Sequence, residues 1–101
     1  MLEYILNNPN LKKYLVEYDE GQILFLEGDD SQDLYILLSG KLDVLKGQRK
    51  ITELNEKGSV FGEMSFLLGE KRTATLKATS LVTAIRIQKD EVPSFLNEFP
   101  E

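Results

Sequence analysis

The sequence predicts a mainly β fold, an antiparallel, jelly-roll-like β-barrel flanked by short N- and C-terminal helices. Two observations support this fold class. Short apolar runs recur between residues 15 and 87, and clusters of Gly, Asp and Asn separate them at regular intervals. At both ends of the chain the apolar residues instead have helical spacing. Residues 1–101 fit one domain, and a composition of 42% hydrophobic and 29% charged residues is typical of a globular protein.

The N-terminal segment is predicted to form a short helix followed by a second turn. Three apolar residues there have helical spacing: Leu2, Ile5 and Leu6. Asn8 can cap the second turn, and Pro9 suits its first position because proline has no N–H to satisfy. Leu11 and Leu15 are expected to share one face of that turn.

Short β-strands are predicted through the middle of the chain, at residues 16–18, 22–26, 34–38, 42–45, 51–54, 73–78 and 81–87. Leu42 and Val44 alternate with polar neighbours, which is typical of a strand with one exposed face. The run at 34–38 is apolar throughout. We therefore expect this strand to lie centrally or to be covered on both faces.

A helix is predicted again near the C-terminal end. Asp90 can serve as its N-cap, and Pro93 is tolerated because the first turn of a helix needs no N–H donor there. The buried stripe of this helix would consist of Val92, Phe95, Leu96 and Phe99.

The composition excludes several classes of chemistry. The chain has no Cys and no His, so it has no disulfide, thiolate metal site, imidazole base or Ser-His-Asp triad. Its net charge of −5 argues against nucleic-acid binding, which needs clustered Lys and Arg. No apolar run approaches the ~20 residues of a membrane span, and no signal peptide is recognisable. We therefore expect a cytoplasmic, non-enzymatic domain without a metal site, a cofactor or a membrane segment.

Residues 61–75 interrupt the strand pattern. Gly62 lets the backbone approach another group closely, and Glu63 opens a short helix that Gly69 ends in a left-handed conformation. The N-terminus of a helix presents unpaired N–H groups and a partial positive charge. This segment therefore favours an anion such as phosphate.

Arg72 follows this short helix and has the parity of the inward-facing Ala74 and Leu76. A buried guanidinium needs a partner, because an uncompensated buried charge costs several kcal/mol. That partner is either the Glu63 carboxylate, in a purely structural salt bridge, or an anionic ligand at the helix terminus. The residues alone leave both hypotheses open.

The same segment resembles the phosphate-binding cassette of cyclic-nucleotide-binding domains, a family that includes catabolite activators, kinase regulatory subunits and cyclic-nucleotide-gated channels. The matching residues are Phe61-Gly62-Glu63, the short helix and Arg72-Thr73-Ala74, and the distance from Glu63 to Arg72 fits without a gap. The resemblance extends over residues 9–100 and includes Glu27-Gly28-Asp29, Leu34-Tyr35-Ile36, Ser39-Gly40 and Gly58.

The resemblance implies a set of binding residues: Gly62, Glu63, Met64, Ser65, Arg72, Thr73 and Ala74. Arg72 would bind the exocyclic oxygens of the cyclic phosphate, because its fork of donors matches two oxygens at once. Glu63 would accept a hydrogen bond from the ribose 2′-hydroxyl, which is free in a 3′,5′-cyclic nucleotide.

The other residues of the set have supporting roles in the family. Backbone N–H groups near Met64, Ser65 and Ala74 would complete the phosphate site, and Gly62 would let the sugar approach. A hydroxyl at the position of Thr73 is associated with contacting the 2-amino group of guanine. Thr73 therefore keeps cGMP open without excluding cAMP, and the resemblance as a whole implies cAMP first and cGMP next.

The function implied is that of a non-enzymatic regulatory module that binds a cyclic nucleotide. Binding would reposition the cassette and, with it, the terminal helix around Phe95 and Leu96. Family members usually continue into a long helix that covers the base, whereas this sequence ends at Glu101. We therefore expect the lid helix to be truncated or absent, and a further domain or partner chain to supply it.

Two other hypotheses belong to different classes. The first is a protein-interaction module on the same fold that no longer binds nucleotide, in which Arg72 would pair with Glu63. The second is an enzyme built on a small β-barrel. It is disfavoured because the sequence offers no evident base, nucleophile or metal cluster.

Overall fold

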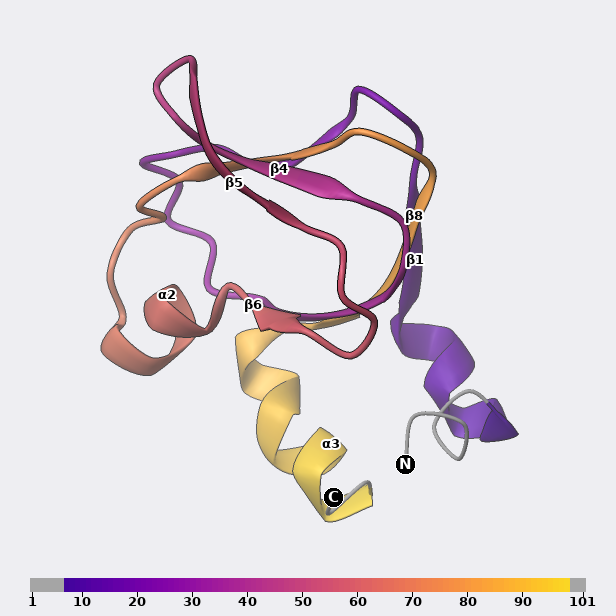
Figure 1. Ribbon diagram of the computed structural model, residues 1–101. Coiled ribbons are helices and arrows are strands. Elements are labelled where there is room, and N and C mark those ends of the chain that lie inside the picture. The colour runs from indigo at the N-terminus through magenta and orange to yellow at the C-terminus, as the bar shows by residue number, and fades with distance from the viewer. Residues whose placement is uncertain (1–6, 99–101) are drawn as a thin grey trace.

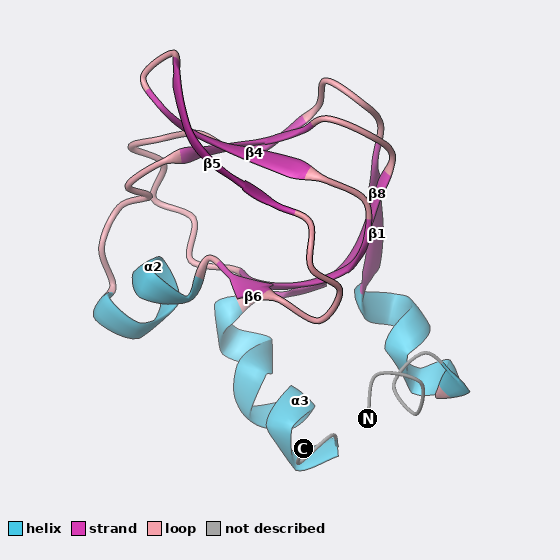
Figure 2. Ribbon diagram, in the orientation of Figure 1, coloured by secondary structure: helices cyan, strands magenta, loops and turns pink. Residues whose placement is uncertain are grey.

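Two four-stranded antiparallel sheets pack face to face and form the body of the protein (Figure 1, Figure 2). The computed structural model describes residues 7–98. The strands of the first sheet follow the order β1 (Leu15–Tyr18), β8 (Val82–Ile87), β3 (Leu34–Ser39) and β6 (Val60–Phe61). Those of the second follow the order β2 (Ile23–Phe25), β7 (Thr75–Ala78), β4 (Leu42–Lys46) and β5 (Arg49–Leu54). The predicted mainly β, jelly-roll-like architecture is confirmed, as two sheets and not as one closed ring.

Short helices flank these sheets. η1 (Pro9–Tyr14) precedes β1, and η2 (Lys89–Glu91) leads from β8 into α3 (Val92–Glu98). Figure 1 shows η1 and α3 on the same side of the sheets, away from β4 and β5, whereas α2 (Glu63–Leu68) lies beside β6. Within residues 7–98, no helix is long and apolar enough to cross a membrane.

The hydrophobic core has two parts, one between the sheets and one between the first sheet and the helices. The inner cluster consists of Phe25, Tyr35, Leu37, Leu42, Phe61, Leu76, Ala78, Val82 and Ala84. The outer cluster consists of Leu11, Tyr14, Leu38, Ile85, Ile87, Val92 and Phe95. Both faces of the first sheet are therefore buried, because the second sheet covers one face and η1 with α3 covers the other.

β3 connects the two clusters. Tyr35 and Leu37 belong to the inner cluster and Leu38 to the outer one, and β3 lies between β8 and β6 in its sheet. A strand gains from an uninterrupted apolar run when both of its faces are covered. The expectation of a central strand covered on both faces is confirmed.

The N-terminal turn is a 3-10 helix and not an α-helix. Asn8 caps it as predicted, because its side chain accepts from the backbone N–H two residues further on at 3.0 Å. A 3-10 helix repeats every three residues, so Tyr14, not Leu15, shares the buried face of Leu11. The expectation for Leu15 is therefore wrong, because it begins β1 and is 41% exposed. The residues outside the described range include Leu2, Ile5 and Leu6.

The apolar stripe of the C-terminal helix is narrower than predicted. Val92 and Phe95 are buried, and the Phe95 ring meets Tyr14 edge-on with 5.2 Å between ring centres. This contact fixes which face of α3 packs against η1. Leu96 is 54% exposed, so its place in the stripe was predicted wrongly, and Phe99 lies outside the described residues.

Several element boundaries also differ. Asp90 does not cap a helix, because the chain first forms η2 after Gln88 and α3 starts only at Val92. β7 begins at Thr75, since the two residues before it form a bend. β6 was not predicted, because a strand of two residues has too little sequence to show a period.

The two neighbouring apolar side chains of α3 should differ in their contribution to stability. Replacing Phe95 by Ala removes a buried ring and should lower the free energy of unfolding by about 3–5 kcal/mol. Replacing Leu96 by Ala removes an exposed side chain and should change it by less than about 0.5 kcal/mol. Urea denaturation of both variants measures the difference, and equal losses would contradict the packing of α3 through Phe95.

Candidate functional site

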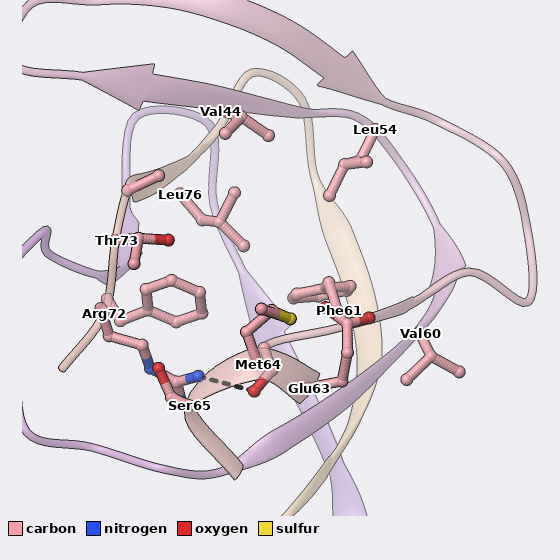
Figure 3. Close-up of a pocket in the computed structure, with 13 residues that line it drawn as sticks. Val44, Leu54, Val60, Phe61, Glu63, Met64, Ser65, Arg72, Thr73 and Leu76 are labelled. Carbon is pink, nitrogen blue, oxygen red and sulfur yellow. Dashed lines mark hydrogen bonds between the residues drawn. The ribbon is translucent and has the colours of Figure 1, made fainter. Parts of the chain in front are cut away.

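A pocket lies between α2, the end of β6 and the strands of the second sheet (Figure 3). Its volume of about 350 Å³ is in the range of small-molecule sites. The pocket is lined by Phe25, Val44, Leu54, Val60, Phe61, Gly62, Glu63, Met64, Ser65, Arg72, Thr73, Ala74 and Leu76. Every binding residue that the resemblance implied is among them. The structure therefore brings the predicted set together around one cavity.

α2 forms one side of the pocket and has a glycine at each end. Gly62 precedes it with φ 80° and Gly69 follows it with φ 67°, both in the left-handed region that glycine adopts freely. The Gly69 N–H donates to the Ser65 carbonyl at 2.9 Å and ends the helix as predicted. A Cβ at Gly62 would lie 2.9 Å from both Arg72 Nη1 and the Asp33 carbonyl oxygen. The position therefore has no room for a side chain.

Arg72 is buried against the pocket, with 3% of its surface exposed. Its Nε donates to Ser31 Oγ at 3.1 Å, Nη1 to the Gly62 carbonyl at 2.9 Å and Nη2 to the Asp33 carbonyl at 2.8 Å. The dashed line in Figure 3 marks the bond to Gly62. Its Cζ lies 4.0 Å from the centre of the Phe25 ring, which adds a cation–π contact. The guanidinium is therefore held in one orientation before any ligand arrives.

None of these hydrogen-bond acceptors is charged. Within residues 7–98 Arg72 forms no salt bridge, so the hypothesis that it pairs with Glu63 is wrong for this structure. The Asp33 carboxylate is engaged by Arg86, whose Nε and Nη2 both lie 2.6 Å from Asp33 Oδ2. Burial lowers the pKa of the Arg72 guanidinium, but an arginine stays protonated in proteins. The buried positive charge beside the pocket thus has neutral hydrogen-bond partners, whereas the carboxylates of Asp33 and Asp29 act on it only through longer-range attraction.

The main chain of Arg72 is also fixed. The Gly28 N–H donates to its carbonyl at 2.7 Å, and its own N–H donates to the Asp29 carbonyl at 2.8 Å. The Asp29 side chain accepts from the Leu26 N–H at 2.9 Å and so closes its own turn. The segment Glu27-Gly28-Asp29, which belongs to the family resemblance, therefore holds Arg72 in place.

The other predicted residues surround the open part of the pocket. Glu63 and Ala74 are half-buried, Ser65 is buried, and Met64 is 56% exposed. Figure 3 shows Glu63, Met64 and Ser65 on α2, with Thr73 on the segment across the cavity. Donors and acceptors thus face one space from two segments that are separate in the sequence.

Much of the pocket lining is apolar, and apart from Phe61, which belongs to the cassette motif, sequence reasoning did not assign these residues to the site. We call these apolar lining residues together the apolar wall: Phe25, Val44, Leu54, Val60, Phe61 and Leu76. Figure 3 shows Val44 and Leu54 on the side of the cavity away from α2. Alternation along residues 42–45 indicates that Val44 faces inward, but a period of two does not distinguish a core position from a pocket wall.

Comparison with known proteins finds similarity to one protein family. The protein-family model described as a cyclic nucleotide-binding domain matches residues 15–99. A cGMP-dependent protein kinase of Toxoplasma gondii is 40% identical over 73 residues, which are 72% of this chain and 7% of that protein. A CRP-like cAMP-activated global transcriptional regulator of Mycobacterium tuberculosis is 27% identical over 90 residues, 85% of this chain and 40% of that protein. The chain thus spans less than half the length of these relatives.

Solved structures share the fold described above. The cAMP-bound structure of PfPKA-R matches with a TM-score of 0.73 and 27% identity, over 81% of this chain and 29% of that one. The half-site-occupied form of the EAL enzyme Bd1971 matches with a TM-score of 0.71 and 28% identity, over 82% and 78% of the two chains.

Substitutions at the two ends of α2 should have unequal effects. Ala at either glycine adopts a strained positive φ, but only at Gly62 does the new Cβ collide with Arg72 and a backbone oxygen. Gly69→Ala is the matched control, because its Cβ would meet one atom at 3.9 Å. We expect Gly62→Ala to lose about 1–3 kcal/mol more stability than Gly69→Ala in chemical denaturation. Equal losses would mean that Gly62 serves the turn alone.

Proposed function

The chain belongs to the cyclic nucleotide-binding domain family, and we propose that its pocket binds a 3′,5′-cyclic nucleotide, with cAMP as the first ligand and cGMP as the alternative. Domains of this family generally regulate and do not catalyse. The observation that supports the proposal most is the charge of Arg72, which is buried beside the pocket among neutral acceptors. A buried charge without a hydrogen-bonded counter-ion is costly, and an anionic ligand would lower that cost.

Arg72 is arranged to bind the two exocyclic oxygens of a cyclic phosphate. A guanidinium has five N–H groups, and the contacts to Ser31, Gly62 and Asp33 use one on each nitrogen. The N–H groups left over are on Nη1 and Nη2, so both terminal nitrogens keep a donor for the ligand. Two hydrogen bonds from one guanidinium suit a phosphate, which offers two oxygens, better than an anion with a single acceptor atom.

Glu63 would accept from the ribose 2′-hydroxyl. It lines the pocket at the start of α2, and among the described residues it forms no salt bridge. An ionised carboxylate accepts and does not donate, which suits a hydroxyl that is free to donate. Backbone N–H groups of Met64, Ser65 and Ala74 would add donors for the phosphate, and Gly62 would leave room for the sugar.

The apolar wall would contact the base. Val44 and Leu54 are partly buried and pack against the inner cluster, so they offer a fixed apolar surface on the side of the pocket away from α2. The Thr73 side chain lies beside the same cavity and would contact the 2-amino group if the base is guanine. Names of the relatives include both a cGMP-dependent and a cAMP-activated protein, which supports keeping both ligands.

Ligand binding would act on the C-terminal helix through α2. Phe66 of α2 packs against the outer cluster, which contains Val92 and Phe95 of α3. A shift of α2 toward the ligand therefore has a packed route to α3. A ligand can move such an equilibrium only by its difference in affinity for the two arrangements. A further domain or a partner chain would supply the lid over the base and the regulated output.

A protein-interaction module that no longer binds nucleotide is the second hypothesis. This hypothesis predicts a salt bridge between Glu63 and Arg72. In the structure Arg72 instead donates hydrogen bonds to neutral acceptors, and Glu63 lines the pocket. The two hypotheses differ in nucleotide binding, so one titration separates them.

Calorimetric titration with cAMP and cGMP is the central test, with 5′-AMP as the control for an open phosphate. We expect saturable binding of at least one cyclic nucleotide.

Arg72→Met should weaken binding by about 2–5 kcal/mol, because it leaves a buried phosphate without its cation. Arg49→Met removes an exposed arginine from β5, outside the pocket, and should bind as the wild type does. Thermal unfolding checks that each variant folds, and Arg72→Lys, which keeps the charge but loses the fork, replaces Arg72→Met if that variant does not. Absence of binding by either nucleotide at millimolar concentration would leave the protein-interaction module as the better hypothesis.

The role of Glu63 has a separate test. Glu63→Ala should weaken cAMP binding by about 1.5–3 kcal/mol, because a hydrogen bond to a charged group is lost, but should leave the binding of 2′-deoxy-cAMP nearly unchanged. Glu70→Ala removes a carboxylate just after α2, outside the pocket lining, and serves as the control. Equal losses for the two nucleotides would exclude Glu63 from contact with the 2′-hydroxyl.

A further inference from the structure

Lys46, at the end of β4, reaches the segment that follows Arg72. Its Nζ donates to the Thr73 carbonyl oxygen at 2.7 Å. The ladder between β4 and β7 ends at the pair Leu45–Thr75, so this carbonyl lies beyond the last strand pairing. The Lys46 ammonium therefore gives the Thr73 carbonyl a hydrogen bond where the strand pairing has ended.

Glu27 holds Lys46 in position. Its Oε2 lies 3.5 Å from Lys46 Nζ, and its Oε1 accepts from the Gly47 N–H at 2.9 Å. Its own backbone N–H donates to Thr75 Oγ1 at 2.8 Å. The Gly47 N–H and the Lys46 charge lower the pKa of the Glu27 carboxyl, so the carboxylate is ionised at neutral pH. Glu27 thus ties the end of β4, through its side chain, to the start of β7, through its backbone N–H.

The contact with Lys46 determines the direction of the next N–H group. The peptide between Thr73 and Ala74 is planar and trans, so its C=O and its N–H point in opposite directions. A carbonyl fixed toward Lys46 therefore turns the Ala74 N–H away from Lys46. Ala74 lines the pocket, and within residues 7–98 no backbone carbonyl accepts from its N–H. The ammonium also polarises the peptide, which makes this N–H a stronger donor.

We propose that Lys46 is a positioning residue for the ligand phosphate, because by holding the Thr73 carbonyl it aims the Ala74 N–H into the pocket. This inference rests on the proposed function, since it concerns the same binding site. Lys46 is absent from the pocket lining, and 54% of its side chain is exposed. It acts through the peptide and does not touch the ligand.

The test compares Lys46→Met with Lys50→Met. Both lysines lie on the β4–β5 hairpin with similar exposure, 54% and 51%, but Lys50 pairs with Asp43 and Glu53. The two substitutions remove the same charge from the same hairpin. We expect Lys46→Met to weaken cAMP and cGMP binding about five- to ten-fold in calorimetry, and Lys50→Met to change it less than about two-fold. Lys46→Arg keeps a charged donor and should recover most of the affinity.

A second measurement needs no ligand. In nuclear magnetic resonance spectra of the free protein, Lys46→Met should shift the Thr73 carbonyl carbon and the Ala74 amide, whereas Lys50→Met should move neither. An affinity equal to that of the wild type, or unmoved resonances in Lys46→Met, would overturn the role of Lys46. If the wild type binds neither cyclic nucleotide, the proposed function fails, and the resonance shifts in the free protein then decide whether Lys46 orients this peptide.

Discussion

The burial of Arg72 among neutral acceptors is the constraint on which the binding region depends. The acceptors Ser31, Gly62 and Asp33 fix the direction of the guanidinium without neutralising it. A carboxylate in their place would satisfy the charge internally and leave no reason for an anion to enter. The chain as a whole has a net charge of −5, yet it places one buried cation beside the pocket.

The two-part core explains how this site is connected to the rest of the molecule. The first sheet is buried on both faces, so a displacement on its inner side is opposed by the helices packed on its outer side. α2 belongs to both regions, because Gly62 at its start contacts Arg72 and Phe66 in its middle packs against the outer cluster. The helix is short, with six residues, and both of its ends are set by glycines.

The features that could be predicted from the sequence are those with a periodic hydrophobic pattern or a recognisable motif. The unbroken apolar run of β3 and the short helix α2 follow from patterning, and the resemblance named the residues that gather around the pocket. Arg72 is buried as predicted, but not as part of the strand, because β7 begins only at Thr75. Contacts made by main-chain groups could not be predicted from the sequence. The Asp33 carbonyl that accepts from Arg72, for example, is present whatever the type of the residue. The contact between Lys46 and Thr73 depends on where a hairpin ends relative to a neighbouring strand, which a linear pattern does not show. The 3-10 form of η1 is likewise decided by packing, because its residues also suit an α-helix.

Three residues of the apolar wall, Val44, Leu54 and Val60, are less tightly packed than the residues around Arg72. Val44 and Leu54 are partly buried and Val60 is 48% exposed, whereas Gly62 and Arg72 are fixed by close contacts. Substitutions in that part of the wall therefore reshape the cavity at a modest cost in folding. If the base binds against these residues, as proposed, copies of such a domain can diverge in the base they prefer while the residues around Arg72 stay the same. Under that proposal, Val44, Leu54 and Val60 can change the selectivity of the pocket with little effect on the stability of the fold.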